Sequence, residues 1–307
     1  METKRTIESS ALSVVIQGSS SRNPLEFELC IQSVKKHLPE SQLIVCTWSG
    51  ERAFDNCENI QIEDPGPEVS ENGYVSNLKR QVLGVRAGLD RAERPYVLKL
   101  RPEIKVIDDS VLNLIEAYKD GIIVMDSISR APWRAAQLFW ISDLITLGSY
   151  RNVSDYWSID ALDVPRFQKK VTLFERIFSG YHGADLVLNS EQILAISYLV
   201  RRGVRVSALR SGVPAPTYAN YLTNLASLET YFHVIEDGEF GLEKPHRLSQ
   251  PSVANSKPPK IGSRWCWLRR YLRTEFLLGL ISSLLRHFSL PWWNRIRMCL
   301  RFISPGR

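Results

Sequence analysis

Short apolar runs alternate with helical patterns along the first part of the chain. Runs rich in β-branched residues, typical of buried strands, occupy 12–16, 43–46, 96–100 and 122–125. Between them, apolar residues recur at helical spacing and predict helices over 27–38, from 76 or 77 to 92, and over 108–118. Strands that alternate with helices predict an α/β domain whose open, mostly parallel sheet is flanked by helices.

The second half of the chain is less regular. A helix is expected over 189–203 and strands over 204–209 and 231–235, with helical stretches near 167–178. Residues 244–262 hold four prolines, several serines and three lysines, a composition typical of a linker. We therefore predict three parts: an α/β domain over 1–243, a linker over 244–262 and a C-terminal tail over 263–307.

The net charge of +6 is concentrated in that tail. The tail holds nine arginines and one acidic residue, whereas residues 1–262 hold 30 basic and 32 acidic residues. A slightly acidic body does not match a nucleic-acid-binding surface, so no nucleic-acid partner is predicted. A hydrophobic content of 44% excludes a wholly disordered chain. Five widely spaced cysteines indicate a reducing compartment, and no apolar run reaches the ~18 residues of a membrane span.

One face of the predicted helix that begins at 76 or 77 is polar. Asn77, Arg80, Gln81 and Gly84 recur at i, i+3, i+4 and i+7 on this face. Three side chains that form hydrogen bonds, beside one small residue, are suited to lining a ligand cleft. An ordinary solvated helix face has the same pattern, and periodicity does not separate the two interpretations.

Charged residues follow the predicted strand 96–100. Lys99, Arg101 and Glu103 together place two cations and a carboxylate at a strand end, where ligands bind in open α/β sheets. Arginine can bind a pyrophosphate with two hydrogen bonds, and a carboxylate can hold a divalent cation or a sugar hydroxyl. A surface ion pair is the alternative. The sequence motifs of dinucleotide-binding domains, P-loops, zincins and serine hydrolases are absent from the sequence.

Several segments resemble, in order and at plausible spacing, the motifs of the WavE-type lipopolysaccharide-biosynthesis family. The resemblance covers about residues 12–244. It is carried by segments 13–18, 43–48, 64–66, 77–81 with Gly88-Leu89, and 96–101, and by the later segments 139–143, 190–192 and 241–244.

This resemblance implies a GT-A-like glycosyltransferase that moves a sugar from a nucleotide-sugar donor to a lipopolysaccharide or other surface-glycan acceptor. It implies that residues at the ends of the first strands surround the base and ribose, supported by the polar helix face; these donor-binding residues are Gln17, Gly18, Thr47, Trp48, Asp64, Asn77, Arg80 and Gln81. Lys99, Arg101 and Glu103 complete the predicted donor site.

The resemblance also implies a divalent cation, Mn²⁺ or Mg²⁺, with Glu103 as its candidate ligand. At this strand end the family typically has Arg-Thr-Asp, where metal-dependent GT-A enzymes carry Asp-x-Asp. This sequence has Arg101-Pro102-Glu103 instead. Glutamate moves the carboxylate outward by one methylene and proline stiffens the turn, which puts metal coordination in question.

An inverting transfer requires a base near the acceptor hydroxyl, and in the GT-A fold this base usually comes from the second half of the domain. The preferred candidates are Glu191, at a predicted helix start, and Asp185, which follows His182 in the preceding loop. Glu175 is a weaker candidate. An acid at a helix start also stabilises the helix dipole, so the role of Glu191 stays open, as does that of Asp143, which orients substrate or caps a helix.

The tail combines arginine with tryptophan and leucine, the composition of helices that lie in a membrane interface among anionic headgroups. The residues expected there are Arg264, Trp265, Trp267, Arg269, Arg270, Arg273, Trp292, Trp293, Arg295 and Arg297. A nucleic-acid arm and a helical hairpin packed on the body are the alternatives. The membrane interpretation predicts a cytoplasmic protein, peripheral on the inner face of the inner membrane, with a lipid-linked or oligosaccharide acceptor.

Two other functions are compatible with the sequence. A nucleotidyltransferase that makes an activated sugar has a similar sheet and opening loop, although residues 18–22 match its glycine-rich phosphate loop poorly. A non-catalytic scaffold that retains the fold would explain the altered Arg-Pro-Glu.

Overall fold

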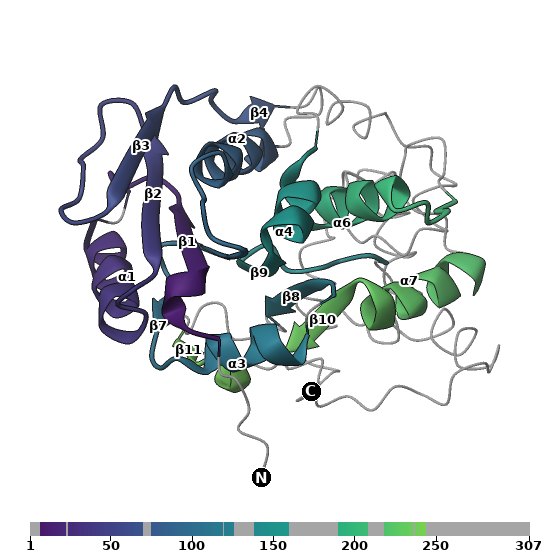
Figure 1. Ribbon diagram of the computed structural model, residues 1–307. Coiled ribbons are helices and arrows are strands. Elements are labelled where there is room, and N and C mark those ends of the chain that lie inside the picture. Colours follow the sequence, from purple (N-terminus) through teal and green to yellow (C-terminus); the bar gives the residue numbers. More distant parts are fainter. Residues whose placement is uncertain are drawn as a thin grey trace, which may run out of the picture.

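A seven-stranded sheet forms the centre of the protein (Figure 1). The structure is a computed structural model, and it describes residues 7–22, 24–69, 75–118, 120–125, 138–159, 190–207, 218–235 and 237–243. In spatial order the strands of the central sheet are β10 (Phe232–Ile235), β8 (Ile122–Met125), β9 (Ile145–Ser149), β6 (Tyr96–Leu100), β1 (Leu12–Gln17), β2 (Gln42–Trp48) and β3 (Glu58–Ile62).

The central sheet is mostly parallel, as the sequence predicts. β1 pairs in parallel with β2 and with β6, β2 pairs in parallel with β3, and β10 pairs in parallel with β8. The exception is β9, which lies between β6 and β8 and is antiparallel to both. From β1 the chain adds β2 and β3 on one side and then crosses to β6 on the other side. The order of strands therefore reverses between β1 and β6.

Helices cover both faces of the sheet (Figure 1). One hydrophobic core lies under α2 (Leu78–Leu89), α4 (Tyr150–Trp157) and α6 (Ser190–Arg201), with α7 (Tyr218–Thr230) packed at its margin. The other core lies under α1 (Pro24–His37) and α3 (Ser110–Ala117). Successive residues of β1 alternate between the two cores, as expected of a central strand buried on both faces.

Short elements complete the described part of the chain. Two small antiparallel pairs are formed by β4 (Glu68–Val69) with β5 (Val75–Ser76) and by β7 (Lys105–Val106) with β11 (Leu242–Glu243). Single-turn helices occupy Ser9–Ala11 and Asp237–Phe240.

Most predicted elements of the α/β domain are confirmed, with ends that shift by a few residues. The predicted strand over 204–209 is not: residues 204–207 form no strand, and 208–209 lie outside the described residues. The helical stretches predicted near 167–178, the linker and the tail also lie outside them. Within the described residues, no helix is both long enough and apolar enough to cross a membrane.

Candidate functional site

A cavity of about 670 Å³ opens at the carboxyl edge of the sheet, where the strand order reverses. In open α/β sheets this switch point is the place where ligands bind, and the volume is within the range of small-molecule sites. The lining comes from the ends of β1, β2 and β6 and from the start of α2: Gln17, Gly18, Ser19, Ser21, Arg22, Glu26, Trp48, Ser49, Glu51, Asp64, Asn77, Arg80, Gln81, Arg101, Pro102 and Glu103.

Nine of the eleven predicted donor-binding residues line this cavity. They are Gln17, Gly18, Trp48, Asp64, Asn77, Arg80, Gln81, Arg101 and Glu103. A smaller cavity of about 340 Å³ lies between the end of α1 and the start of β2, and no predicted site residue lines it. Three of the four residues of the predicted polar face of α2, all except Gly84, therefore form part of the wall of the larger cavity.

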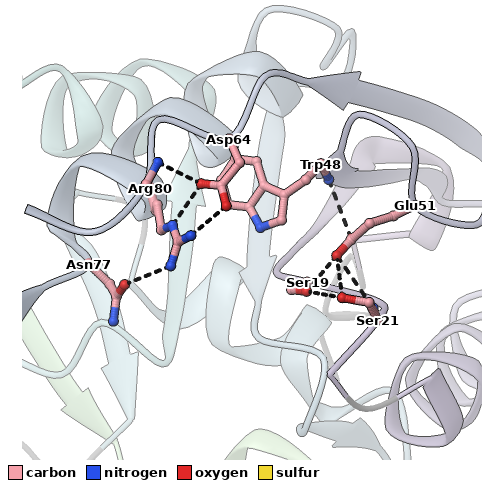
Figure 2. Close-up of polar contacts among 8 residues, drawn as sticks. Ser19, Ser21, Trp48, Glu51, Asp64, Asn77 and Arg80 are labelled. Carbon is pink, nitrogen blue, oxygen red and sulfur yellow. Dashed lines mark hydrogen bonds and ion pairs between the residues drawn. The ribbon is translucent and has the colours of Figure 1, made fainter.

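The start of α2 is joined to the loop after β3 by an ion pair (Figure 2). The guanidinium of Arg80 contacts both oxygens of Asp64, with Nε 2.7 Å from Oδ1. The backbone N–H of Gly66 also donates to Oδ1 of Asp64, and Arg80 Nη1 donates to Oδ1 of Asn77 at 3.3 Å. The hydrogen bond from Arg80 is the main reason that the pKa of Asp64 lies below its ordinary value. Asp64 is therefore an ionised group held in a fixed orientation.

The loop after β1 is closed around the carboxylate of Glu51 (Figure 2). The hydroxyls of Ser19, Ser20 and Ser21 donate to this carboxylate at 2.5, 3.1 and 2.8 Å, and the backbone N–H of Ser20 donates at 2.8 Å. Burial acts to raise the pKa of Glu51, but these hydrogen bonds outweigh it and the pKa is lowered. The position in which a loop of this kind could hold an external anion is thus filled by a side chain of the protein.

The turn after β6 packs against the loop after β1. A Cβ atom added to Gly18 would lie 2.9 Å from Cγ of Pro102, so the two loops touch at a place where only glycine fits. In the same turn, Arg101 Nη2 lies 2.9 Å from Oε1 of Glu103. The side chain of Glu103 is 7% exposed and that of Arg101 is 35% exposed, so the arginine is the more accessible member of the pair.

Two predicted donor-binding residues, Thr47 and Lys99, do not line the cavity. Thr47 is buried within β2. Lys99 is completely buried, with its ammonium donating to the backbone carbonyl of Asp143 and lying 4.9 Å from the ring centroid of Trp157. Burial lowers the pKa of Lys99 to about 8, although the negative charge of Asp143 opposes this shift.

Polar groups gather around Lys99 on the α4 and α6 side of β6. The side chain of Asp143 is buried, and its Oδ1 has no hydrogen-bond partner among the described residues; the same holds for the hydroxyl of Tyr156. Glu191 lies half-buried in the first turn of α6. Burial, followed by the charges of Asp143 and Glu191, raises the pKa of Tyr156. Of the predicted acids, Glu191 and Asp143 therefore lie together near Lys99, while Asp185 and Glu175 lie outside the described residues, as does His182.

Several lining residues were not predicted from the sequence. Ser19, Ser21 and Arg22 belong to a segment that the sequence marks only as a poor match to a glycine-rich phosphate loop, and Glu26 lies in the first turn of α1. Glu51 has no sequence signal of its own, because its role depends on contacts with residues about 30 positions away. The ten tail residues predicted to contact a membrane lie outside the described residues.

Comparison with protein families gives a match to the family described as WavE lipopolysaccharide synthesis, over residues 12–298. The match spans the α/β domain and the predicted linker and continues into the tail. No curated protein matches the chain.

Proposed function

Because the chain belongs to the WavE lipopolysaccharide synthesis family, and thus to a family with a role in lipopolysaccharide biosynthesis, we propose that it is a glycosyltransferase with a GT-A-like fold. It moves a sugar from a nucleotide-sugar donor to a lipopolysaccharide or related glycan. One observation carries this proposal: the cavity at the switch point between β1 and β6, whose walls hold ionised and amide side chains in fixed orientations.

The donor nucleotide is bound between the start of α2 and the end of β2. Asp64, held by Arg80, accepts hydrogen bonds from hydroxyl or base N–H groups, and the amide of Gln81 lies on the same wall. The indole of Trp48 supplies an aromatic surface at the end of β2. Carboxylates, amides and an aromatic ring are the groups that recognise a base and its ribose through hydrogen bonds and stacking.

The chemical step takes place beside the turn after β6. Arg101 faces the cavity, while Asp143 and Glu191 lie near Lys99 on the adjoining side of the strand. A carboxylate there takes the proton of the acceptor hydroxyl as the bond from that oxygen to the sugar forms and the nucleotide departs. We propose Glu191 for this role because it is half-exposed, whereas Asp143 is buried.

The nucleotidyltransferase alternative is disfavoured by Glu51. Such an enzyme would hold a triphosphate in the loop after β1, but the backbone N–H of Ser20 and the hydroxyls of this loop already donate to the Glu51 carboxylate. A phosphate bound to these same N–H and hydroxyl donors would have to displace Glu51 and would be repelled by its negative charge.

Thermal-shift measurements with UDP-, GDP-, CMP- and dTDP-sugars and with free nucleoside triphosphates test the proposal. Stabilisation by one class of nucleotide-sugar is expected, and replacing Arg80 with methionine should abolish it. Arg91→Met is the matched control, because Arg91 also pairs with an acid, Glu58, but lies outside the cavity. Stabilisation by triphosphates alone would support the nucleotidyltransferase, and no stabilisation by any nucleotide would support the scaffold.

A further inference from the structure

The carboxylate expected to hold a divalent cation does not fit that role. Glu103 is 7% exposed and directs Oε1 at the guanidinium of Arg101, 2.9 Å away. Its charge contributes, after burial, to raising the pKa of the Cys30 thiol, so the carboxylate lies close to α1. A cation bound to this carboxylate, at about 2 Å from an oxygen, would lie beside the positive charge of Arg101.

The other carboxylates of the lining also have internal partners or stand alone. Asp64 is held by Arg80, and Glu51 by the serines after β1. Glu26 comes singly from the first turn of α1. Within the described ranges, no three histidine, cysteine or acidic side chains come together as potential metal ligands.

The cavity instead presents cations to a ligand. Arg101 is one third exposed beside its partner. Arg22, at the end of the loop after β1, also lines the cavity, is exposed, and forms no ion pair or hydrogen bond with its side chain among the described residues. The hydrogen bond from Arg80 is the largest cause of the lowered pKa of Asp64, and the positive charge of Arg22 is a smaller cause. Arg22 therefore lies near Asp64 and so near the proposed nucleotide. Arginines bind phosphate oxygens with charge-assisted, often paired hydrogen bonds.

We infer that Arg22 and Arg101 bind the diphosphate of the donor in place of a divalent cation, so that the chain takes nucleoside diphosphate sugars without a metal. This inference rests on the proposed function. Both loops that carry the arginines are held rigid, one by Glu51 and the other by the contact of Pro102 with Gly18. The backbone that carries both arginines is thus held before the ligand arrives, and Glu103 also orients the guanidinium of Arg101, which limits the entropy lost on binding.

Calorimetric titration of the full chain with UDP, GDP and dTDP, and with the corresponding monophosphates, tests this inference. Each titration is run with excess EDTA and with Mn²⁺. For the diphosphate that binds, we expect dissociation constants that agree within about twofold under both conditions. Arg22→Gln should weaken binding of the diphosphate roughly tenfold or more, since a hydrogen bond to a charged group contributes about 1.5–3 kcal/mol. Binding of the corresponding monophosphate should be weakened less by Arg22→Gln.

Two further variants control for the buried pair and for general charge. Arg101→Gln combined with Glu103→Gln removes both charges and so avoids leaving a buried carboxylate alone. This double variant should weaken binding of the diphosphate as much as Arg22→Gln does. Arg52→Gln removes an exposed arginine that pairs with Glu28 outside the cavity and should change nothing.

The outcomes separate this inference from the proposed function. Failure of every nucleotide to bind contradicts the proposed function itself. Binding of a diphosphate that requires Mn²⁺ overturns the inference and leaves the function standing, and its loss in Glu103→Gln or Glu26→Gln would identify the carboxylate that holds the cation. Metal-free binding that is unaffected by the arginine variants also overturns it, as does binding of a nucleoside monophosphate with no binding of any diphosphate.

Discussion

Lys99 is the residue whose environment departs furthest from what its position in the sequence suggests. A charged lysine beside Arg101 indicates a ligand contact, yet the side chain is buried in the core under α4 and α6 and does not line the cavity. Fully buried ammonium groups are costly unless they are paired. Its neighbours compensate only in part: Asp143 and Glu191 favour the charged form, while burial and Arg101 oppose it.

This environment predicts a dependence of stability on pH. The pKa of Lys99 is about 8 in the folded protein and 10.5 for a lysine exposed to water, as in the unfolded chain, so between these values the unfolded chain binds more protons. Folding stability therefore rises with pH in this window. From about pH 7.5 to about pH 9.5 the free energy of unfolding should rise by roughly 2 kcal/mol more in the wild type than in Lys99→Met.

Urea titration with a reductant present measures this difference. Burial raises the pKa of the Cys30 and Cys46 thiols, and these groups act in the opposite direction because the unfolded chain loses their protons first. Both proteins carry these thiols, so their effect cancels in the comparison. Lys105→Met, at a half-buried lysine of β7, should follow the wild type. If the unfolding free energies of the wild type and Lys99→Met changed with pH in the same way, the predicted effect of the buried ammonium would be contradicted.

At the scale of the element, α2 has two separate roles, and each depends on a different glycine. A Cβ atom on Gly88 would lie 2.5 Å from Cγ1 of Val15 and 2.8 Å from Sγ of Cys46, so this glycine lets the helix pack on β1 and β2. A Cβ atom on Gly84 would instead lie 2.7 Å from Cγ of Gln17, whose side chain lines the cavity. One end of the helix thus supports the sheet and the middle positions a residue of the site.

Alanine at each position should therefore have a different effect. Gly88→Ala overpacks the core against a stiff valine and a buried cysteine, and should cost about 1–3 kcal/mol of unfolding free energy. Gly84→Ala displaces the side chain of Gln17, which borders the cavity, so it should cost less stability than Gly88→Ala, while nucleotide affinity should fall up to about tenfold through the lost Gln17 contact. Urea unfolding and calorimetry measure the two quantities. Gly238→Ala, which has open space around it, is the control; equal losses of stability in both α2 variants would contradict this division.

The sequence predicted the elements whose own residues carry a strong pattern. β1, β2, β6 and β8 are buried along their length and were found from their apolar runs. β3 was missed because it is an edge strand with a half-exposed, polar sequence, specified mainly by its pairing with β2. β9 was missed as well, and its reversed direction depends on β6 and β8, which lie on both sides of it.

The candidate site shows the same limit. Residues at strand ends and on one helix face, such as Gln17 and Arg80, could be assigned to a cavity because the carboxyl edge of the sheet is known once the strands are known. The orientation of Lys99 could not be predicted from the sequence, because it depends on which of the two cores the alternate residues of β6 face. The engagement of Glu51 by a distant serine loop also required the tertiary structure.

At the scale of the whole molecule, the charge is unevenly distributed along the chain. Residues 1–262 carry slightly more acidic than basic residues and contain the sheet and the cavity, whereas residues 263–307 carry nine arginines and one acid among aromatic residues. The family match continues to residue 298, so most of this tail belongs to the matched region. We propose that this arginine- and tryptophan-rich tail brings the protein to an anionic membrane surface, where its acceptor would be found.

The proposed membrane role of the tail can be tested in the full chain. Arg269→Gln combined with Arg270→Gln keeps the aromatic residues and removes two charges, each contributing about 1 kcal/mol near an anionic surface, so binding to phosphatidylglycerol vesicles should weaken roughly 30-fold. Nucleotide binding should be unchanged. Vesicle co-sedimentation measures this, with Arg91→Gln on the body as the control and deletion of residues 263–307 as the limiting case. Undiminished vesicle binding by the deletion variant, with its nucleotide affinity intact, would show that the tail is not the anchor.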